Sequence, residues 1–304
     1  MSPRESRPLH HYDAMIASII IRTLTRGGLY ALLASGMSLI FGVAHIVNLA
    51  HTAFFMVAAY GMWFLMRELG WGAIESAVVT IPVVTLLGVL VYRLLIDRVR
   101  QHAQVVLLIT VALAMVLQEV LLLQFGSHYR TAPPLIGGSH SIFGAVVTNQ
   151  HLLILGAVAV IMIVMWLVLS RTKLGISIRA TAQDAEIANL MGISIPRTLM
   201  LTMGIGTALA AVAGVLTAPV WVFHPHIWMS PLTMVLAIVI LGGLGSIKGS
   251  VIGAFIMGLV ETLVIFLLPQ QGYMRMAFAL LAMVVVLAVR PEGLFGTVFE
   301  EERL

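Results

Sequence analysis

The sequence predicts an all-α fold, a polytopic bundle of about eight or nine helices that span a membrane. Of its 304 residues, 60% are hydrophobic and 10% are charged, and the mean hydropathy is +1.05, whereas about a quarter of the residues of an average soluble domain are charged. Long apolar runs recur along the chain without the in/out alternation of barrel strands. Because only helices and closed barrels satisfy their backbone hydrogen bonds in lipid, these runs predict helices.

The expected elements follow in order. Residues 1–23 predict a polar, interfacial approach to the first span, because their apolar run is short, Arg22 follows it and no convincing cleavage site closes it. Residues 24–290 form a single transmembrane domain, and residues 291–304 form a cytoplasmic tail. The apolar runs are Leu24–Val43, Ile46–Met66, Ile74–Ile96, Val105–Phe125, Leu152–Leu169, Leu199–Ala218, Leu232–Leu241, Val251–Leu268 and Met274–Val289.

Three rows of small residues, spaced four apart, predict places where helix backbones approach one another closely. The rows are Gly27, Ala31 and Ser35; Gly206, Ala210 and Gly214; and Gly245, Gly249 and Gly253.

Two glycine-bearing segments, near 42–51 and 242–250, predict broken or re-entrant helices. In transporters such breaks expose backbone groups to cargo, so they supply the candidate pathway residues. Asn48 and His51 lie three apart and share one face of a helix; hydrogen bonds between helices explain them as well as contact with cargo does. The candidates are Gly42, Asn48, His51, Gly242, Gly243 and Gly245.

The second of these segments, "GGLGSIKGS", does not predict a nucleotide site. A phosphate loop needs Gly-Lys-Ser/Thr between a strand and a helix, whereas here Lys248 precedes Gly249 between apolar runs. The chain also lacks cysteine and the motifs of hydrolases and zinc proteases, so it predicts no catalytic residue, no metal site and no cofactor of its own. Without an Arg/Lys stripe interleaved with aromatic residues, it predicts no nucleic-acid partner.

Basic residues predict the orientation. Arg93–Arg100 carries three arginines and Ser170–Leu199 carries four basic residues, so both segments should be cytoplasmic. Two full spans before Ile74 would then place the basic N-terminus outside. Either the first 66 residues contain a re-entrant helix, or the charge bias at the terminus is overruled.

The second basic segment also contains a predicted helix, Thr181–Met191, which Gly192 would end. Its short apolar stripe suits either a helix that lies on the membrane surface or a helix that docks on a cytoplasmic partner.

Two acidic residues, Glu119 and Glu261, fall within predicted spans. Ionisable groups in lipid normally face the bundle interior, so both are candidates for burial, and pairing with a neighbouring helix is favoured over contact with cargo. Glu261 is the stronger candidate, because Glu119 lies past the middle of its run, where a snorkelling or interfacial position is the alternative. His224 and His226, without a third ligand nearby, are more typical of a polar turn than of a metal site.

Three blocks of this sequence resemble the branched-chain amino acid permease subunits of ABC importers, the LivH type. They are "GGLYALLASGMSLIFGVAHIVNLAHTAFFMVAAY", "SRTKLGISIRATAQDAEIANLMGISIPR" and "AIVILGGLGSIKGSVIGAFIMGLVE". The sequence departs from the family at Leu49, where Phe is frequent, and at Thr52, where Gly is usual. A β-branched residue stiffens the latter position, which bears on the cargo.

The resemblance implies a multi-pass subunit in a bacterial inner membrane, in contact with membrane lipid. Its expected partners are a homologous second permease subunit, two cytoplasmic ATP-binding subunits that use ATP and Mg, and a periplasmic solute-binding protein. The expected cargo is a branched-chain or hydrophobic amino acid, or a related small amide or amino-acid solute. A stand-alone carrier coupled to H⁺ or Na⁺ is the alternative.

The same resemblance implies that the loop at about 171–198 couples the permease to its ATPases. The implied coupling residues are Arg179, Ala182, Asp184, Ala185, Glu186, Ala188, Leu190, Met191 and Gly192.

Overall fold

The computed structural model describes residues 9–142 and 145–296 and confirms the predicted all-α membrane fold. Within these residues, seven helical stretches are long and apolar enough to cross a membrane, and α10 is a shorter apolar helix. The principal helices are α1 (Leu9–Ala44), α2 (His51–Arg67), α3 (Ala73–Val91), α5 (Ala103–Phe125), α6 (Asn149–Arg171), α9 (Ile195–Thr217), α10 (Met229–Gly242), α11 (Ile247–Leu267) and α12 (Arg275–Val289).

Short elements connect the principal helices. They are the π-helical turn η1 (Tyr92–Ile96), α4 (Asp97–Val99), α7 (Lys173–Gln183), α8 (Ala185–Leu190), the 3₁₀ turn η2 (Pro269–Met274), and the strands β1 (Ser139–Ile142) and β2 (Ala145–Thr148). The two strands form an antiparallel hairpin that pairs Ser139 with Thr148. Sequence patterns did not predict this hairpin.

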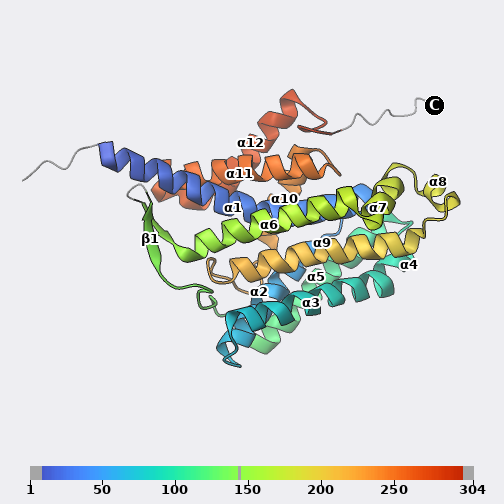
Figure 1. The fold of residues 1–304 in the computed structure, drawn as a ribbon, viewed down its shortest axis with the longest axis horizontal. Coiled ribbons are helices and arrows are strands. Elements are labelled where there is room, and N and C mark those ends of the chain that lie inside the picture. Colours follow the sequence, from blue (N-terminus) through green and yellow to red (C-terminus); the bar gives the residue numbers. More distant parts are fainter. Residues whose placement is uncertain (1–8, 143–144, 297–304) are drawn as a thin grey trace, which may run out of the picture.

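The bundle has two distinct ends (Figure 1). The basic end carries α4, α7 and α8, and therefore the arginines of 93–100 and the basic residues of 171–197. The hairpin end carries β1 and β2, and β2 packs beside α1. The connection after α9 lies at the hairpin end too, because it pairs with the segment that leads from α5 into β1. The backbone N–H of Arg130 donates to the carbonyl of Phe223, and the reverse bond is also made, each at 2.9 Å.

Helix α1 begins at the hairpin end, upstream of the apolar run predicted at Leu24. Residues 9–23, expected as an approach segment, continue α1 without interruption, while residues 1–8 lie outside the described part of the chain. Two antiparallel helices, α1 and α2, thus precede α3. The described part of the predicted tail, 291–296, returns to the basic end, where the N–H of Leu294 donates to the carbonyl of Leu241 at 2.8 Å.

Helix α1 lies at the centre of the bundle and packs chiefly against α11 and α9. Its glycines meet glycines of other helices. A Cβ on Gly36 would lie 2.9 Å from the carbonyl oxygen of Gly206, and one on Gly258 would lie 2.8 Å from the nitrogen of Gly27. Such contacts let the backbones approach as predicted from the rows of small residues.

The tightest glycine contact that positions the α10–α11 turn joins Gly242 and Gly249. A methyl group on Gly249 would overlap the carbonyl group of Gly242, which is backbone and cannot move aside. We therefore expect Gly249→Ala to lower the free energy of unfolding by about 1–3 kcal/mol, the range for overpacked sites, as measured by thermal unfolding in detergent.

Gly156→Ala is the matched control, because no atom lies within 4 Å of an added Cβ there and alanine favours a helix over glycine by roughly 0.5–1 kcal/mol. Equal melting temperatures for the two variants would contradict the proposed contact.

Candidate functional site

The two predicted helix breaks are confirmed, and they contact each other. Helix α1 ends at Ala44 and α2 begins at His51, while α10 ends at Gly242 and α11 begins at Ile247. A Cβ on Gly42 would lie 3.0 Å from the carbonyl oxygen of Gly245. Segments some 200 residues apart in the sequence therefore meet at the basic end.

Left-handed backbone conformations shape both breaks. His45 has a φ of 53°, which is uncommon for a residue with a side chain, and its N–H donates to the carbonyl of Phe41 at 2.8 Å. Gly243 and Gly245 have φ values of 96° and 82°. The glycines adopt this conformation without steric cost, so the strain is confined to the first break.

A cavity of about 610 Å³ adjoins the meeting point of the breaks, between α1, α6, α7 and α11. It brings together four residues that the sequence assigned to two different sites. Gly42 and Gly245 were pathway candidates, and Arg179 and Ala182 were coupling candidates. We call this cavity the inner cavity. At the basic end of the bundle it joins residues of the predicted pathway to residues of the predicted coupling loop.

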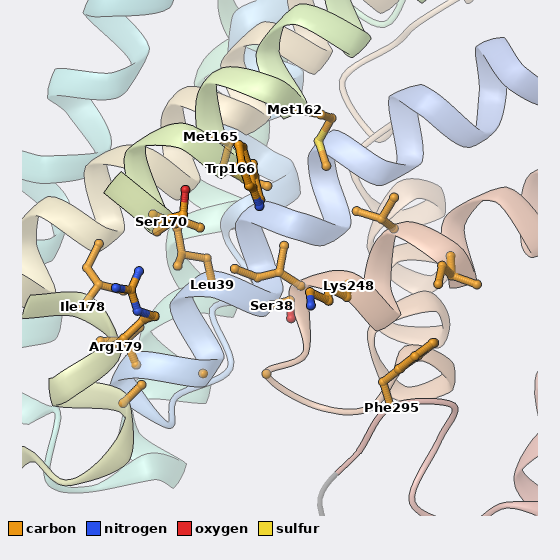
Figure 2. Close-up of a pocket in the computed structure, with 18 residues that line it drawn as sticks. Ser38, Leu39, Met162, Met165, Trp166, Ser170, Ile178, Arg179, Lys248 and Phe295 are labelled. Carbon is orange, nitrogen blue, oxygen red and sulfur yellow. The ribbon is translucent and has the colours of Figure 1, made fainter. Parts of the chain in front are cut away.

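The wall of the inner cavity is mainly apolar, and two cations stand at it (Figure 2). Met162, Met165 and Trp166 of α6 lie together on one part of the wall, while Arg179 and Lys248 approach from α7 and α11. Sequence reasoning considered Lys248 only as a phosphate-loop residue and missed the α6 residues, since their spacing is that of an ordinary span. The cavity suits a small solute with an apolar side chain and an anionic group.

Asn48 and His51 are buried between helices. The Asn48 side chain accepts from the N–H of Ala50 at 3.1 Å, and its Nδ2 lies 3.7 Å from the sulfur of Met203 on α9. His51 Nε2 lies 3.0 Å from the carbonyl oxygen of Leu33 on α1. Because a carbonyl only accepts, Nε2 carries the proton. In this conformation Asn48 links the segment before α2 to α9, and His51 links α2 to α1; a role in the pathway stays a prediction.

The predicted helix 181–191 is wrong in one respect, because it divides at Asp184. This residue is extended, with φ −158° and ψ 108°, and its carboxylate accepts from the N–H of Ile187 at 2.8 Å. An aspartate in this position caps the start of a new helix, which separates α7 from α8. The predicted end is confirmed, since Gly192 is left-handed.

Helix α8 presents apolar side chains to the outside. Ile187, Leu190 and Met191 are exposed, whereas Ala188 is buried against the rest of the chain. Asp184, Ala185 and Glu186 are exposed as well. An apolar tip on a basic loop is suited to docking against a groove of another protein.

The coupling loop also faces the first helix break. A cavity of about 240 Å³ is lined by Val43–Ile46 on one side and by Thr181 and Ala185 on the other, with Tyr92 and Arg100 beside them. Helix α7 also packs beside α1, so the predicted coupling loop and the segment that joins α1 to α2 are neighbours.

Of the two acidic candidates for burial, only Glu261 is buried. Tyr30 donates to its Oε2 at 3.0 Å, while Arg26 and Arg275 lie 3.1 Å and 3.0 Å from its Oε1. The predicted pairing is confirmed. The burial predicted for Glu119 is wrong, because α5 buries the stripe Val106, Thr110, Ala114, Gln118 and Leu121. Glu119 follows Gln118 directly in the sequence, so it points off this stripe and is exposed.

Comparison with known proteins places the fold and the site in context. Residues 19–287 match the family described as "Branched-chain amino acid transport system / permease component". The chain is 30% identical to the high-affinity branched-chain amino acid transport system permease protein LivH of Escherichia coli over 90% of this chain and 93% of that protein. It is 29% identical to the corresponding protein BraD of Pseudomonas aeruginosa over 95% and 97% of the two chains.

The fold resembles a chain of a solved structure, PsaBC from Streptococcus pneumoniae in complex with Fab. The TM-score is 0.50 at 15% identity, over 91% of this chain and 97% of that one.

The absence of cysteine from the sequence allows a direct test of the inner cavity. We expect Ala182→Cys, on the cavity wall, to react with a water-soluble maleimide at least tenfold faster than Ala53→Cys, because Ala53 is fully buried and a buried thiol is inert. Labelling rates in detergent, followed by mass spectrometry, measure the difference. Equal rates in the folded protein would contradict the cavity.

Proposed function

Because this chain belongs to the branched-chain amino acid transport system permease family, we propose that it moves branched-chain or other hydrophobic amino acids inward across the bacterial inner membrane. ATPase subunits on separate chains drive this transport. The observation that carries this proposal is the inner cavity, whose apolar wall adjoins both helix breaks and the coupling loop. Related small amide or amino-acid solutes fit the same cavity chemistry.

The basic end faces the cytoplasm. It carries the arginines of 93–100 and the basic residues of 171–197, and positively charged connections stay on the cytoplasmic side. The start of α1, the hairpin and the connection after α9 then face the periplasm. In this orientation the charge bias of the N-terminus is overruled, since the antiparallel helices α1 and α2 both precede α3.

The ATPases dock on α8. Leu190 and Met191 are exposed at its end, and Ile187 stands beside them. The chain offers no phosphate loop of its own, so ATP and Mg belong to the docked subunits. A homologous second permease and a periplasmic solute-binding protein complete the importer, by analogy with the systems for which the relatives are named.

A displacement caused by docking is transmitted to the pathway residues where the coupling loop and the first helix break line the same small cavity. A shift of Thr181 and Ala185 displaces Val43–Ile46, and the contact of Gly42 with Gly245 passes this shift to the second break. Net import follows when the inward-facing and outward-facing states bind cargo with different affinities.

The ion-coupled alternative finds less support. Glu261 is held by two arginines and a tyrosine, so it is engaged in an ion-pair network inside the chain. His51 is hydrogen-bonded to a backbone carbonyl, and Glu119 faces away from the bundle interior.

Thr52 marks a difference that bears on the cargo. It is fully buried at the start of α2, and its hydroxyl oxygen finds no partner among the described residues. A buried hydroxyl without a partner is costly, so a polar group of the cargo or a water molecule would complete its bonding in a transport state.

Uptake into proteoliposomes tests this function. With the ATPase subunits and the binding protein present, we expect leucine accumulation to require ATP on the side of the ATPases. Accumulation that persists without the ATPase subunits and collapses with the proton gradient would contradict the proposal.

A single substitution at the tip of α8 tests the docking site. Leu190→Arg is expected to abolish co-purification of the ATPase subunits and to reduce uptake at least tenfold, because an arginine cannot enter an apolar groove without a partner for its charge. Leu190 is 80% exposed, so the chain itself should fold normally.

Val146→Arg is the matched control, since Val146 is 78% exposed at the hairpin end. Co-purification that is equal in the two variants would show that docking lies elsewhere.

A further inference from the structure

A second large cavity, of about 560 Å³, opens at the hairpin end between α1, α11, α12 and the connection that follows α9. We call it the outer cavity. It lies at the other end of α1 from the inner cavity, and its lining combines charged side chains with apolar ones. None of the residues assigned to the pathway or to coupling lines it.

The charged side of the outer cavity is organised around Glu261. The carboxylate is 5% exposed, whereas Arg26 and Arg275, which contact it, are 22% and 49% exposed. Both arginines lie close to the same oxygen, Oε1, and the hydroxyl of Tyr30 donates to Oε2. Three neighbours thus hold the carboxylate, while each arginine keeps N–H donors that Glu261 does not engage.

These groups leave the outer cavity with one surplus positive charge. Two guanidinium groups stand against one carboxylate among its described lining residues. Each guanidinium has five N–H donors in a planar fork, and Glu261 engages only part of them. His224 adds no charge at neutral pH, since burial, and then the neighbouring His226, lower its pKa. A carboxylate is the anion whose geometry the free donors match.

The lining also contains apolar side chains. Trp221 and Ile227 are among them, and the Trp221 ring lies 5.9 Å from the ring of Tyr30. A ligand that joins a carboxylate to a branched apolar side chain would contact both kinds of side chain at once. The volume of the outer cavity lies within the range of typical small-molecule sites, roughly 300–1,000 Å³.

We propose that the outer cavity is an entry site that binds the carboxylate of an apolar amino acid through Arg275 and Arg26, while Trp221 and Ile227 contact its side chain. This inference rests on the proposed function, because it gives the transported solute a first binding site on the periplasmic side. Glu261 positions the two guanidinium groups and keeps them from repelling each other.

Binding of small probes to the permease–ATPase complex, without binding protein, tests the site. The probes are leucine, 4-methylpentanoate, which has the carboxylate alone, and 3-methylbutylamine, which has the ammonium alone. We expect the first two to bind and the amine to bind at least tenfold more weakly, as measured by calorimetry or ligand-observed NMR. Equal binding of the amine, or no binding of either carboxylate, would overturn the proposal.

Substitutions locate the binding. Arg275→Gln should weaken both carboxylate probes at least tenfold, and Arg275→Lys, which keeps the charge, should retain part of the affinity. Arg22→Gln is the matched control, since Arg22 is exposed one turn before Arg26 and lies over Phe266 instead. Wild-type affinity in folded Arg275→Gln would overturn the site.

Because the inner cavity also suits an apolar carboxylate, the location of binding is decided by the variants. If Arg275→Gln does not fold, Arg275→Lys takes its place, and full wild-type affinity in Arg275→Lys would overturn the site. ATP-dependent uptake that persists while the outer cavity fails these tests would overturn the entry site alone. Loss of the ATP requirement would overturn the proposed function, whatever the cavity binds.

Discussion

The close approach of α1 to its neighbours is the constraint on which the rest of the structure depends. Lipid gives apolar helices no hydrophobic reason to associate, so packing between backbones must hold the bundle together. Glycines on α1 provide it at three levels, and each level meets a glycine of another segment. The pairs are Gly27 with Gly258, Gly36 with Gly206, and Gly42 with Gly245. A side chain at any of these positions would separate α1 from α9, α11 or the turn before α11.

This arrangement gives one helix a part in both the inner and the outer cavity. At the hairpin end α1 supplies Arg26 and Tyr30 to the outer cavity, and at the basic end it supplies Gly42 to the inner cavity. Between them, its carbonyl at Leu33 holds His51 of α2. Under the proposed function, a displacement of residues 43–46 would therefore act on a helix that reaches both cavities. In packed helices such displacements occur as small rigid shifts rather than as continuous bending.

The spans and the helix breaks were predictable from sequence because both depend on local composition: the length of an apolar run, and glycines at its end. Features that depend on the packing of distant segments were not. The three partners of Glu261 come from two other helices, and Tyr30 lies 231 residues away in the chain. Glu119 was wrongly expected inside because only the structure shows which stripe of α5 is buried. The division at Asp184 follows from a capping bond that an unbroken run of helix-forming residues conceals.

We propose that ATPase subunits reshape the inner cavity through the predicted coupling loop. Trp166 of α6 and Ile252 of α11 both line that cavity and are exposed, so cysteines at these two positions can carry spin labels in a chain that has no other thiol. Pulsed EPR on the assembled importer would measure the distance between the labels without nucleotide and with ATP trapped on the ATPases. The account predicts a shift in the mean distance between these two states. An identical distance distribution in both, in a preparation that hydrolyses ATP and imports leucine, would contradict it.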